Sequence, residues 1–155
     1  MRKDAQSSVR DAQKAGIQVV MMTGDGAQTA AAVAGKCGIL TEGGVCISGD
    51  VLRAMSDGEV TELIPRLNVV SRALPSDKLR LVELAKSSGL VAGMTGDGVN
   101  DAPSLCAADV GFAMGSGSEV ASAASDIVIL DSSLRSIVNA VLFGRTIFKS
   151  IRKFI

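Results

Sequence analysis

The sequence predicts an α/β domain with a mainly parallel β-sheet and helices on both of its faces. Short apolar runs of strand length alternate along the chain with stretches of helical periodicity, which is the pattern of such folds. The apolar runs are nearly continuous rather than alternating in polarity, as expected for strands that helices cover on both sides. The chain has 155 residues, 47% of them hydrophobic and 21% charged, so its length and composition are those of one globular domain.

The first half of the chain is predicted to hold three strands and the helices that connect them. Gly16 and Gly38 lie just past two helical stretches, where glycine commonly ends a helix. Pro65 closes the third helical stretch, and Ser76 can cap the fourth, whose apolar residues lie on one side. The expected strands are 17–22, 45–47 and 68–71, and the expected helices are 4–15, 28–36, one or two short ones within 51–66, and one that begins near 76.

The second half ends in a long amphipathic helix. Its last turns carry Arg145, Lys149, Arg152 and Lys153, a cationic end that either complements the helix dipole or approaches a membrane surface. We expect strands over 90–94, 109–114 and 127–130, and helices over 103–108, 119–125 and 134–155.

The composition excludes several classes of function. The formal net charge is +0 and only 3% of the residues are aromatic, so we expect no nucleic-acid partner. No apolar run approaches the roughly 18 residues that a membrane-spanning helix needs. The chain contains no histidine, which excludes Ser-His nucleophiles and the usual zinc sites. Any catalysis must therefore use carboxylates, lysine, hydroxyls, backbone amides and a metal.

The stretch from 93 to 107, G-M-T-G-D-G-V-N-D-A-P-S-L-C-A, joins a predicted strand to a predicted helix. A glycine-rich turn in this position presents backbone N–H groups and a helix N-terminus to an anion. It also carries Asp97 and Asp101, which suit a Mg²⁺ ion that bridges carboxylates and phosphate. The alternative is that both aspartates are only turn and helix-cap residues.

The pentapeptide M-T-G-D-G occurs twice, at 22–26 and at 94–98, each time after an apolar run. Loops at the carboxyl ends of parallel strands open onto a shared crevice, so one ligand could be held from two sides. Lys78 lies in the first turn of its helix, where the helix dipole slightly disfavours a cation. It is either a surface lysine or a lysine directed at an anion across the crevice.

These motifs together resemble the phosphorylation domain of P-type cation-transporting ATPases, and most closely the calcium-pump-like members. That domain has a Rossmann-like, haloacid-dehalogenase-like fold, and the resemblance covers essentially the whole chain. The matching blocks are A-G-I-x-V-V-M-M-T-G-D at 15–25, S-R-A-L-P-S-D-K at 71–78, M-T-G-D-G-V-N-D-A-P at 94–103, A-D-V-G-F-A-M-G at 108–115, A-S-D-I-V-I-L-D at 124–131 and G-R-x-I-F at 144–148.

The resemblance implies a site for a transferred phosphoryl group. Thr23 and Gly24 would hold one of its oxygens through a hydroxyl and an amide, with Asp25 beside them. Lys78 would neutralise the phosphoryl charge, and Asn100 would complete the phosphate-binding shell.

The resemblance also implies Mg²⁺ as a cofactor, with Asp97 and Asp101 as its ligands, and ATP as the substrate of the full-length parent. Lys78, Thr23 and Asp101 would be the catalytic residues. Phosphoryl transfer depends mainly on positioning and on charge neutralisation, which agrees with this set of side chains.

One part of the family pattern is absent. The nucleophile of the family is the aspartate of D-K-T-G on the central strand of the sheet, and neither D-K-T-G nor D-x-D occurs in this sequence. The nucleotide-binding insert and the membrane helices are missing as well. We therefore expect residues 1–133 to be part of a phosphorylation domain without its central strand, and residues 134–155 to begin a helical stalk that leads toward the membrane.

From this pattern we expect a segment of an ATP-driven, calcium-type cation pump at the cytoplasmic face of a membrane. It would supply the Mg²⁺- and phosphoryl-binding half of an aspartyl-phosphate site and would not hydrolyse ATP alone. Its partners would be the transported cation and the remainder of the pump, namely the nucleophile strand, the nucleotide-binding domain and the membrane helices. The isolated fragment could self-associate. The alternatives are a stand-alone phosphatase of the same fold and a non-catalytic module that binds phosphate or Mg²⁺.

Overall fold

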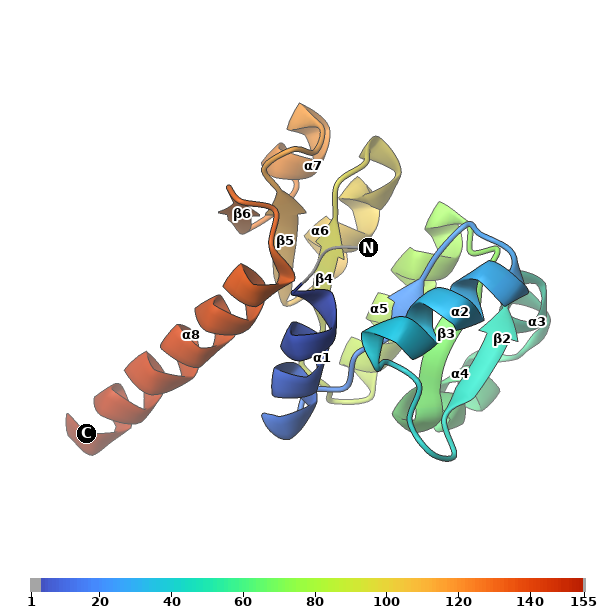
Figure 1. Ribbon diagram of the computed structural model, residues 1–155, viewed down its shortest axis with the longest axis horizontal. Coiled ribbons are helices and arrows are strands. Elements are labelled where there is room, and N and C mark those ends of the chain that lie inside the picture. Colours follow the sequence, from blue (N-terminus) through green and yellow to red (C-terminus); the bar gives the residue numbers. More distant parts are fainter. Residues whose placement is uncertain (1–3, 155) are drawn as a thin grey trace.

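The structure, a computed structural model, describes residues 4–154 and contains two three-stranded parallel sheets. In the first sheet the order is β1, β3, β2, and in the second it is β4, β5, β6. Figure 1 shows β6, β5 and β4 on one side of the molecule and β1, β3 and β2 on the other. All strand pairs are parallel, so the predicted α/β class is confirmed. The strands are β1 (Met21–Met22), β2 (Val45–Ser48), β3 (Leu67–Ser71), β4 (Gly93–Gly96), β5 (Val110–Met114) and β6 (Ile127–Ile129).

The predicted sheet is interrupted between β1 and β4. Within residues 4–154, β1 pairs only with β3, and β4 pairs only with β5, so each has one unpaired edge. These two strands carry the two copies of the T-G-D sequence, at or just beyond their carboxyl ends. The interruption therefore separates the two halves of the predicted site.

Helices cover both faces of the first sheet. Successive strand residues point to opposite faces, so Val69 and Val70 of β3 enter two different apolar clusters. Val69 packs with Val9 of α1 (Ala5–Lys14) and Ala34 of α2 (Ala27–Cys37). Val70 packs with residues of the helices on the other face, which are α3 (Gly49–Ala54), α4 (Asp57–Leu63), η1 (Ile64–Arg66) and α5 (Pro75–Ser87).

The second sheet packs against two short helices that follow a 3₁₀ turn. Leu105 and Ala121 from the two helices meet Ala113 of β5 in a third buried cluster. The approach is close at Gly111, where a Cβ atom would lie 2.8 Å from the carbonyl oxygen of Leu105. The 3₁₀ turn is η2 (Val99–Asp101) and the helices are α6 (Ala102–Ala107) and α7 (Glu119–Ala123).

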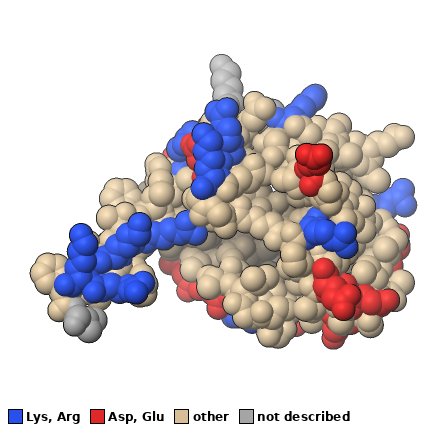
Figure 2. Space-filling view, turned by 90° about the horizontal axis from the view of Figure 1, so that it is seen from below, with Lys and Arg blue, Asp and Glu red and all other residues tan. Residues whose placement is uncertain are grey.

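The last helix, α8 (Leu134–Phe154), is attached to α1 and then extends away from the body (Figure 1). Arg135 forms an ion pair with Asp11, Val138 is buried, and the Arg145 guanidinium donates to the Ala15 carbonyl at 2.6 Å. Figure 2 shows lysine and arginine side chains along the extended part. In the described part of the chain no helix is both long and apolar enough to span a membrane. The large exposed apolar residues of α8 are Leu142, Phe143, Ile147, Phe148, Ile151 and Phe154.

Two strands differ from their predicted ranges for identifiable reasons. The first strand was predicted over 17–22, but only 21–22 pair, because the Gln18 side-chain amide donates to the carbonyls of Ile64 and of Leu67, the first residue of β3. The fourth was predicted over 90–94 but lies at 93–96. The Asp109 carboxylate accepts the Ala92 N–H at 2.8 Å, and the ladder with β5 begins one residue later.

The helix predicted to be capped by Ser76 begins instead at Pro75, with Leu74 as its N-cap. The capping oxygen comes from Asp77, whose Oδ2 accepts the Leu74 N–H at 2.8 Å. Ser76 lies within the first turn and is exposed. The assignment of Ser76 as the cap is therefore wrong, because the carboxylate three residues beyond the N-cap reaches back to it.

We expect the isolated chain to self-associate through the unpaired edges of β1 and β4, since open strand edges are templates for pairing. Sedimentation velocity over a range of concentrations should show dimers or larger species. Thr95→Lys, which adds a charge to the exposed Thr95 of β4, should reduce this association. A monomer with a sharp cooperative thermal transition at all concentrations would contradict the prediction.

The pairing of Asp109 makes stability depend on pH. The Ala92 N–H and the nearby Lys86 ammonium hold the pKa of Asp109 below its ordinary value of 3.8. Between the lower pKa of the folded state and 3.8, the unfolded chain therefore binds more protons than the folded chain. The contribution of Asp109 to the free energy of unfolding is present above pH 3.8 and is lost as pH falls through the pKa of the folded state.

Asp109→Asn should therefore lower the free energy of unfolding near neutral pH, and the difference from the wild type should shrink as pH falls below 3.8. Urea titrations from about pH 7 down to about pH 2.5, which span this window, would measure the change. Glu42→Gln is the control, because the exposed Glu42 carboxylate makes no hydrogen bond or ion pair within residues 4–154. An Asp109→Asn deficit that does not change with pH would contradict the assignment.

Candidate functional site

Four connecting segments gather at the carboxyl ends of the parallel strands, the edge where open α/β sheets bind ligands. The first loop, residues 23–26, follows β1, and the second loop, residues 97–101, follows β4. The 72–74 turn joins β3 to α5, and the serine loop, residues 115–118, joins β5 to α7. Every residue that the sequence singled out for phosphate or metal binding lies in these loops or in the first turn of α5.

The first loop is an exposed turn that Thr23 and Asp25 close. The Asp25 N–H donates to Thr23 Oγ1 at 3.1 Å, and the Thr23 hydroxyl donates to Asp25 Oδ2 at 3.0 Å. Gly24 and Asp25 are exposed, while Thr23 is half-buried. The hydroxyl and the amide that were predicted to hold an oxygen therefore lie at the ligand edge, with the hydroxyl engaged by Asp25.

The 72–74 turn is joined to the first loop by backbone hydrogen bonds. The Ala73 N–H donates to the Thr23 carbonyl, and the Arg72 N–H donates to the Asp25 carbonyl, both at 2.9 Å. Arg72 has a φ of 50°, a left-handed conformation that directs the chain from β3 across to this loop. As a result, α5 begins directly beside the T-G-D sequence, and Lys78 is carried in its first turn.

Lys78 connects the first half of the site to the second. Its Nζ lies 2.6 Å from Asp101 Oδ1, in an ion pair whose side chains are 20% and 10% exposed. The other oxygen of Asp101, Oδ2, accepts the Gly98 N–H at 3.3 Å. The prediction that Lys78 faces an anion across the site is consistent with this contact, and the anion in the structure is Asp101.

Gly96 is the point where the second loop folds back on itself most closely. A Cβ atom on Gly96 would lie 2.5 Å from the Cβ of Asp101 and 2.8 Å from its carboxyl carbon. Only glycine leaves room for the Asp101 side chain in this position. The glycine of this T-G-D copy is therefore required for packing, before any role in ligand binding.

The serine loop supports Asp97 from the other side. The Ser118 N–H donates to the Asp97 carbonyl at 2.8 Å, and a Cβ on Gly117 would lie 2.7 Å from that same oxygen. The Asp97 carboxylate itself is exposed and makes no hydrogen bond or ion pair within residues 4–154. Asn100 is exposed on η2, on the same loop.

The two aspartates predicted as Mg²⁺ ligands therefore differ in availability. Among the described residues Asp97 has no partner for its carboxylate, which suits a metal ligand. Asp101 already uses both oxygens, on Lys78 and on the Gly98 amide. In the described part of the chain no three acidic or cysteine side chains form a metal cluster. The residues present fit a Mg²⁺ ion that takes one protein carboxylate and further oxygens from phosphate and water, as Mg²⁺ commonly does.

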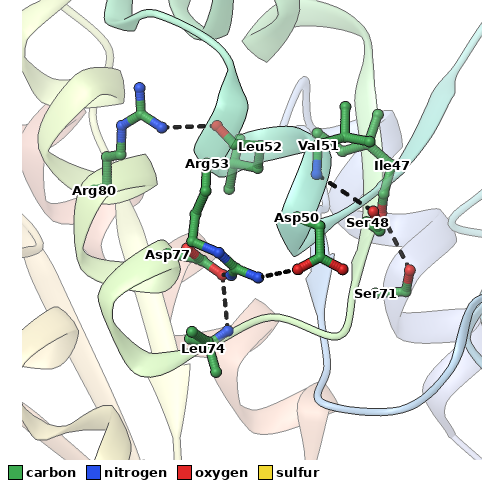
Figure 3. A network of polar contacts seen from close by, with 10 residues as sticks. All are labelled: Ile47, Ser48, Asp50, Val51, Leu52, Arg53, Ser71, Leu74, Asp77 and Arg80. Carbon is green, nitrogen blue, oxygen red and sulfur yellow. Dashed lines mark hydrogen bonds and ion pairs between the residues drawn. The ribbon is translucent and has the colours of Figure 1, made fainter.

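The structure adds supporting residues that the sequence reasoning missed. Gly117 and Ser118 position Asp97, and their signal was the G-S-G-S sequence after a strand. Arg53 on α3 contacts Asp77, the residue before Lys78 (Figure 3). No feature of the sequence around Arg53 pointed to this contact; its partner Asp77 read as an ordinary acidic residue in the first turn of α5.

These features define a parallel α/β protein that gathers two T-G-D loops, a lysine and two carboxylates at its ligand edge. A family model described as a haloacid dehalogenase-like hydrolase matches residues 1–109, more than half of the chain. The chain belongs to the haloacid dehalogenase-like hydrolases.

Several curated relatives are calcium pumps by name. The chain is 49% identical over its whole length to calcium-transporting ATPase PAT1 of Dictyostelium discoideum and covers 14% of that protein. It is 46% identical over its whole length to calcium-transporting ATPase 2 of Cryptococcus neoformans and covers 11% of it. The chain thus spans only about a seventh to a ninth of the length of these relatives.

The fold also matches solved structures of P-type ATPases. A crystal structure of a zinc-transporting PIB-type ATPase in its E2.Pi state superimposes with a TM-score of 0.75 and 29% sequence identity. The match covers 99% of this chain and 21% of the zinc transporter. The family resemblance that the sequence motifs indicated is therefore confirmed.

The two copies of T-G-D give a matched test of packing. Gly96→Ala should lower the free energy of unfolding by about 1–3 kcal/mol, because the added methyl group displaces Asp101. Gly24→Ala should be neutral or stabilising by about 0.4–1 kcal/mol, since nothing lies within 4 Å of its Cβ position. Urea unfolding monitored by circular dichroism measures both. Equal effects of the two substitutions would contradict the structural distinction between the loops.

Proposed function

We propose that the chain is a segment of an ATP-driven calcium pump and supplies the Mg²⁺- and phosphoryl-binding half of an aspartyl-phosphate site. The observation that carries this proposal is the Lys78–Asp101 ion pair, which brings the first and second T-G-D loops to one edge beside the interruption between β1 and β4. The names of the relatives, at 44–49% identity, support calcium rather than zinc as the cation.

In this proposal the first loop and α5 bind the phosphoryl group. The Gly24 amide donates a hydrogen bond to one of its oxygens, and the Thr23 hydroxyl donates to the same oxygen once it releases Asp25 Oδ2. The Asp25 N–H, which donates to Thr23 Oγ1, keeps the hydroxyl in place. The Lys78 ammonium neutralises the phosphoryl charge, and the Asn100 side-chain amide donates a hydrogen bond to the phosphoryl group from the second loop. Such fixed donors and charges provide most of the catalysis in phosphoryl transfer, where positioning and electrostatic stabilisation dominate.

Asp101 holds Lys78 at the ligand edge, which keeps the ammonium ion ordered before a phosphoryl group is present. Asp97 is the protein carboxylate for Mg²⁺, and Asp101 is available as a second ligand only if Lys78 leaves it. When bound, Mg²⁺ supplies charge neutralisation at the phosphoryl oxygens.

The proposed partner at the interruption is a strand from the rest of the pump. The open edges of β1 and β4 can each form a parallel ladder with one strand placed between them, which would complete the sheet. By the family resemblance that strand carries the D-K-T-G nucleophile, and D-K-T-G is absent from these 155 residues. The chain alone is therefore proposed to be inactive in ATP hydrolysis.

The remaining partners follow from the same assignment. The nucleotide-binding domain and the membrane helices belong to the rest of the pump, and the segment lies at the cytoplasmic face of the membrane. The extended part of α8, with exposed apolar residues and basic side chains, is proposed to continue toward the membrane as a stalk (Figure 2).

A chimera tests the proposal directly. The matching segment of the Dictyostelium calcium-transporting ATPase PAT1 is replaced by this chain, to which it is 49% identical. The chimera should form a phosphoenzyme from ATP in a Ca²⁺-dependent manner. Lys78→Ala in the chimera should lower turnover by about 10²-fold or more.

Lys36→Ala, which removes an exposed lysine at the end of α2, is the matched control and should leave turnover unchanged. A Lys78→Ala chimera with normal phosphoenzyme formation would show that the assigned role is wrong. Mg²⁺-dependent phosphatase activity of the 155-residue chain alone would favour a stand-alone hydrolase instead.

A further inference from the structure

A network of charged side chains lies beneath the first turn of α5 (Figure 3). The Arg53 guanidinium, from α3, lies between two carboxylates. One nitrogen pairs with Asp77, and the other donates to Asp50 at 2.5 Å. Asp50 is 69% exposed, whereas Asp77 is 2% exposed, so the buried partner is the one that depends on Arg53.

Asp77 is the group that fixes how α5 begins. Its Oδ2 accepts both the Leu74 N–H, at 2.8 Å, and the Arg53 guanidinium. The first bond caps the helix and closes the turn that leads into Pro75. The second neutralises a carboxylate that would otherwise be buried with no compensating charge.

The surrounding backbone leaves little freedom for this arrangement. At Gly49, the first residue of α3, a Cβ atom would lie 2.5 Å from the Arg72 carbonyl, 2.8 Å from Asp77 Oδ2 and 2.9 Å from Arg53 Nη1. The start of α3 is thus pressed against both the 72–74 turn and the Arg53–Asp77 pair. Backbone hydrogen bonds from Arg72 and Ala73 also join the 72–74 turn to the first loop.

Lys78 follows Asp77 directly in the chain, so its backbone position is set by the same helix turn. We propose that Arg53 is a positioning residue for the phosphate site: by pairing with Asp77 it locks the N-terminal turn of α5 and so places the Lys78 ammonium on Asp101. Within residues 4–154, Arg53 itself forms no hydrogen bond or ion pair with Lys78 or Asp101. The inference rests on the proposed phosphate-binding role of Lys78 and assigns a residue that supports it.

Arg80, which lies on α5, provides a matched comparison for Arg53. It also ties α5 to the α3–α4 region, donating to the carbonyls of Leu52 at 2.7 Å and Met55 at 2.8 Å and pairing with Asp57. Among the described residues it bonds neither to Asp77 nor to the Leu74 cap. Arg80→Met therefore removes comparable bonds between the same elements without removing the partner of the buried carboxylate.

The test uses the 155-residue chain, labelled with ¹³C and ¹⁵N, and the NMR signals of the Lys78 side chain, assigned by their loss in Lys78→Arg. In the wild type the ordered, ion-paired ammonium should give dispersed ε-methylene signals. Arg53→Met should move them to the position of a free lysine. Arg80→Met should lower the denaturation midpoint but leave the Lys78 signals in place.

Two further variants separate positioning from general stability. Arg53→Lys retains a charge that can pair with Asp77 and should restore the Lys78 signals at least in part. In the double variant Arg53→Met with Asp77→Asn, no buried charge is left unpaired, and the introduced amide oxygen can still accept the Leu74 N–H. The double variant should therefore recover the signals that Arg53→Met alone loses, and it remains informative if the single variant unfolds.

A titration with inorganic phosphate in the presence of Mg²⁺ adds the functional readout. Arg53→Met should weaken phosphate binding on the order of tenfold, in parallel with the loss of the Lys78 signals. Wild-type Lys78 signals that match a free lysine, or that are unchanged in Arg53→Met, or that Arg80→Met moves equally, would overturn the inference. If the signals change as expected but the wild type binds no phosphate, the positioning role stands and the proposed phosphate site fails.

Discussion

The contact on which the candidate site depends is the ion pair between Lys78 and Asp101. Lys78 belongs to a helix that packs on the first sheet, whereas Asp101 follows a strand of the second, and the two sheets share no ladder within the described residues. The pair therefore joins the two halves of the site across the interruption. It is short and only 10–20% exposed, so water screens it less than it screens a surface pair. Each half-sheet, in turn, supplies the support that keeps its own member of the pair in place.

The supports on the two sides are of different kinds. On the first side, backbone hydrogen bonds join the 72–74 turn to the first loop, and the buried Asp77 holds the helix start. On the second side, close packing has the same effect, because Gly96 admits the Asp101 side chain and Gly117 admits the Asp97 backbone at distances that a side chain would not allow. Both loops have polar contacts, but only the second also depends on close packing at glycine positions. This explains how the same five letters, M-T-G-D-G, produce an exposed turn at 22–26 and a tightly packed one at 94–98.

The sequence predicted the order of strands and helices along the chain, because that order follows from local apolar patterns. It also predicted that Thr23, Lys78 and Asp101 gather at one edge, because the carboxyl ends of parallel strands lie on the same side of a sheet. The exact strand limits could not be predicted, because side chains distant in sequence decided them. Gln18 occupies the carbonyls of Ile64 and Leu67, and the Asp109 carboxylate accepts the Ala92 N–H. Ser76 was a reasonable cap by residue type, but the reach of Asp77 determined the helix start. The role of Arg53 depends on the packing of α3 against the start of α5, which no local sequence pattern predicts.

The attachment of α8 has a mechanical consequence. The helix is fixed by Arg135 to Asp11 of α1 and by Arg145 to the Ala15 carbonyl just beyond α1, while its far end extends away from the body (Figure 1). A 21-residue helix is about 31 Å long, so a tilt of the body by about 10° sweeps the far end through about 5 Å. The carboxyl end of α8 is therefore displaced more than its attachment at Arg135 whenever the body tilts and α1 and α8 move as one rigid piece.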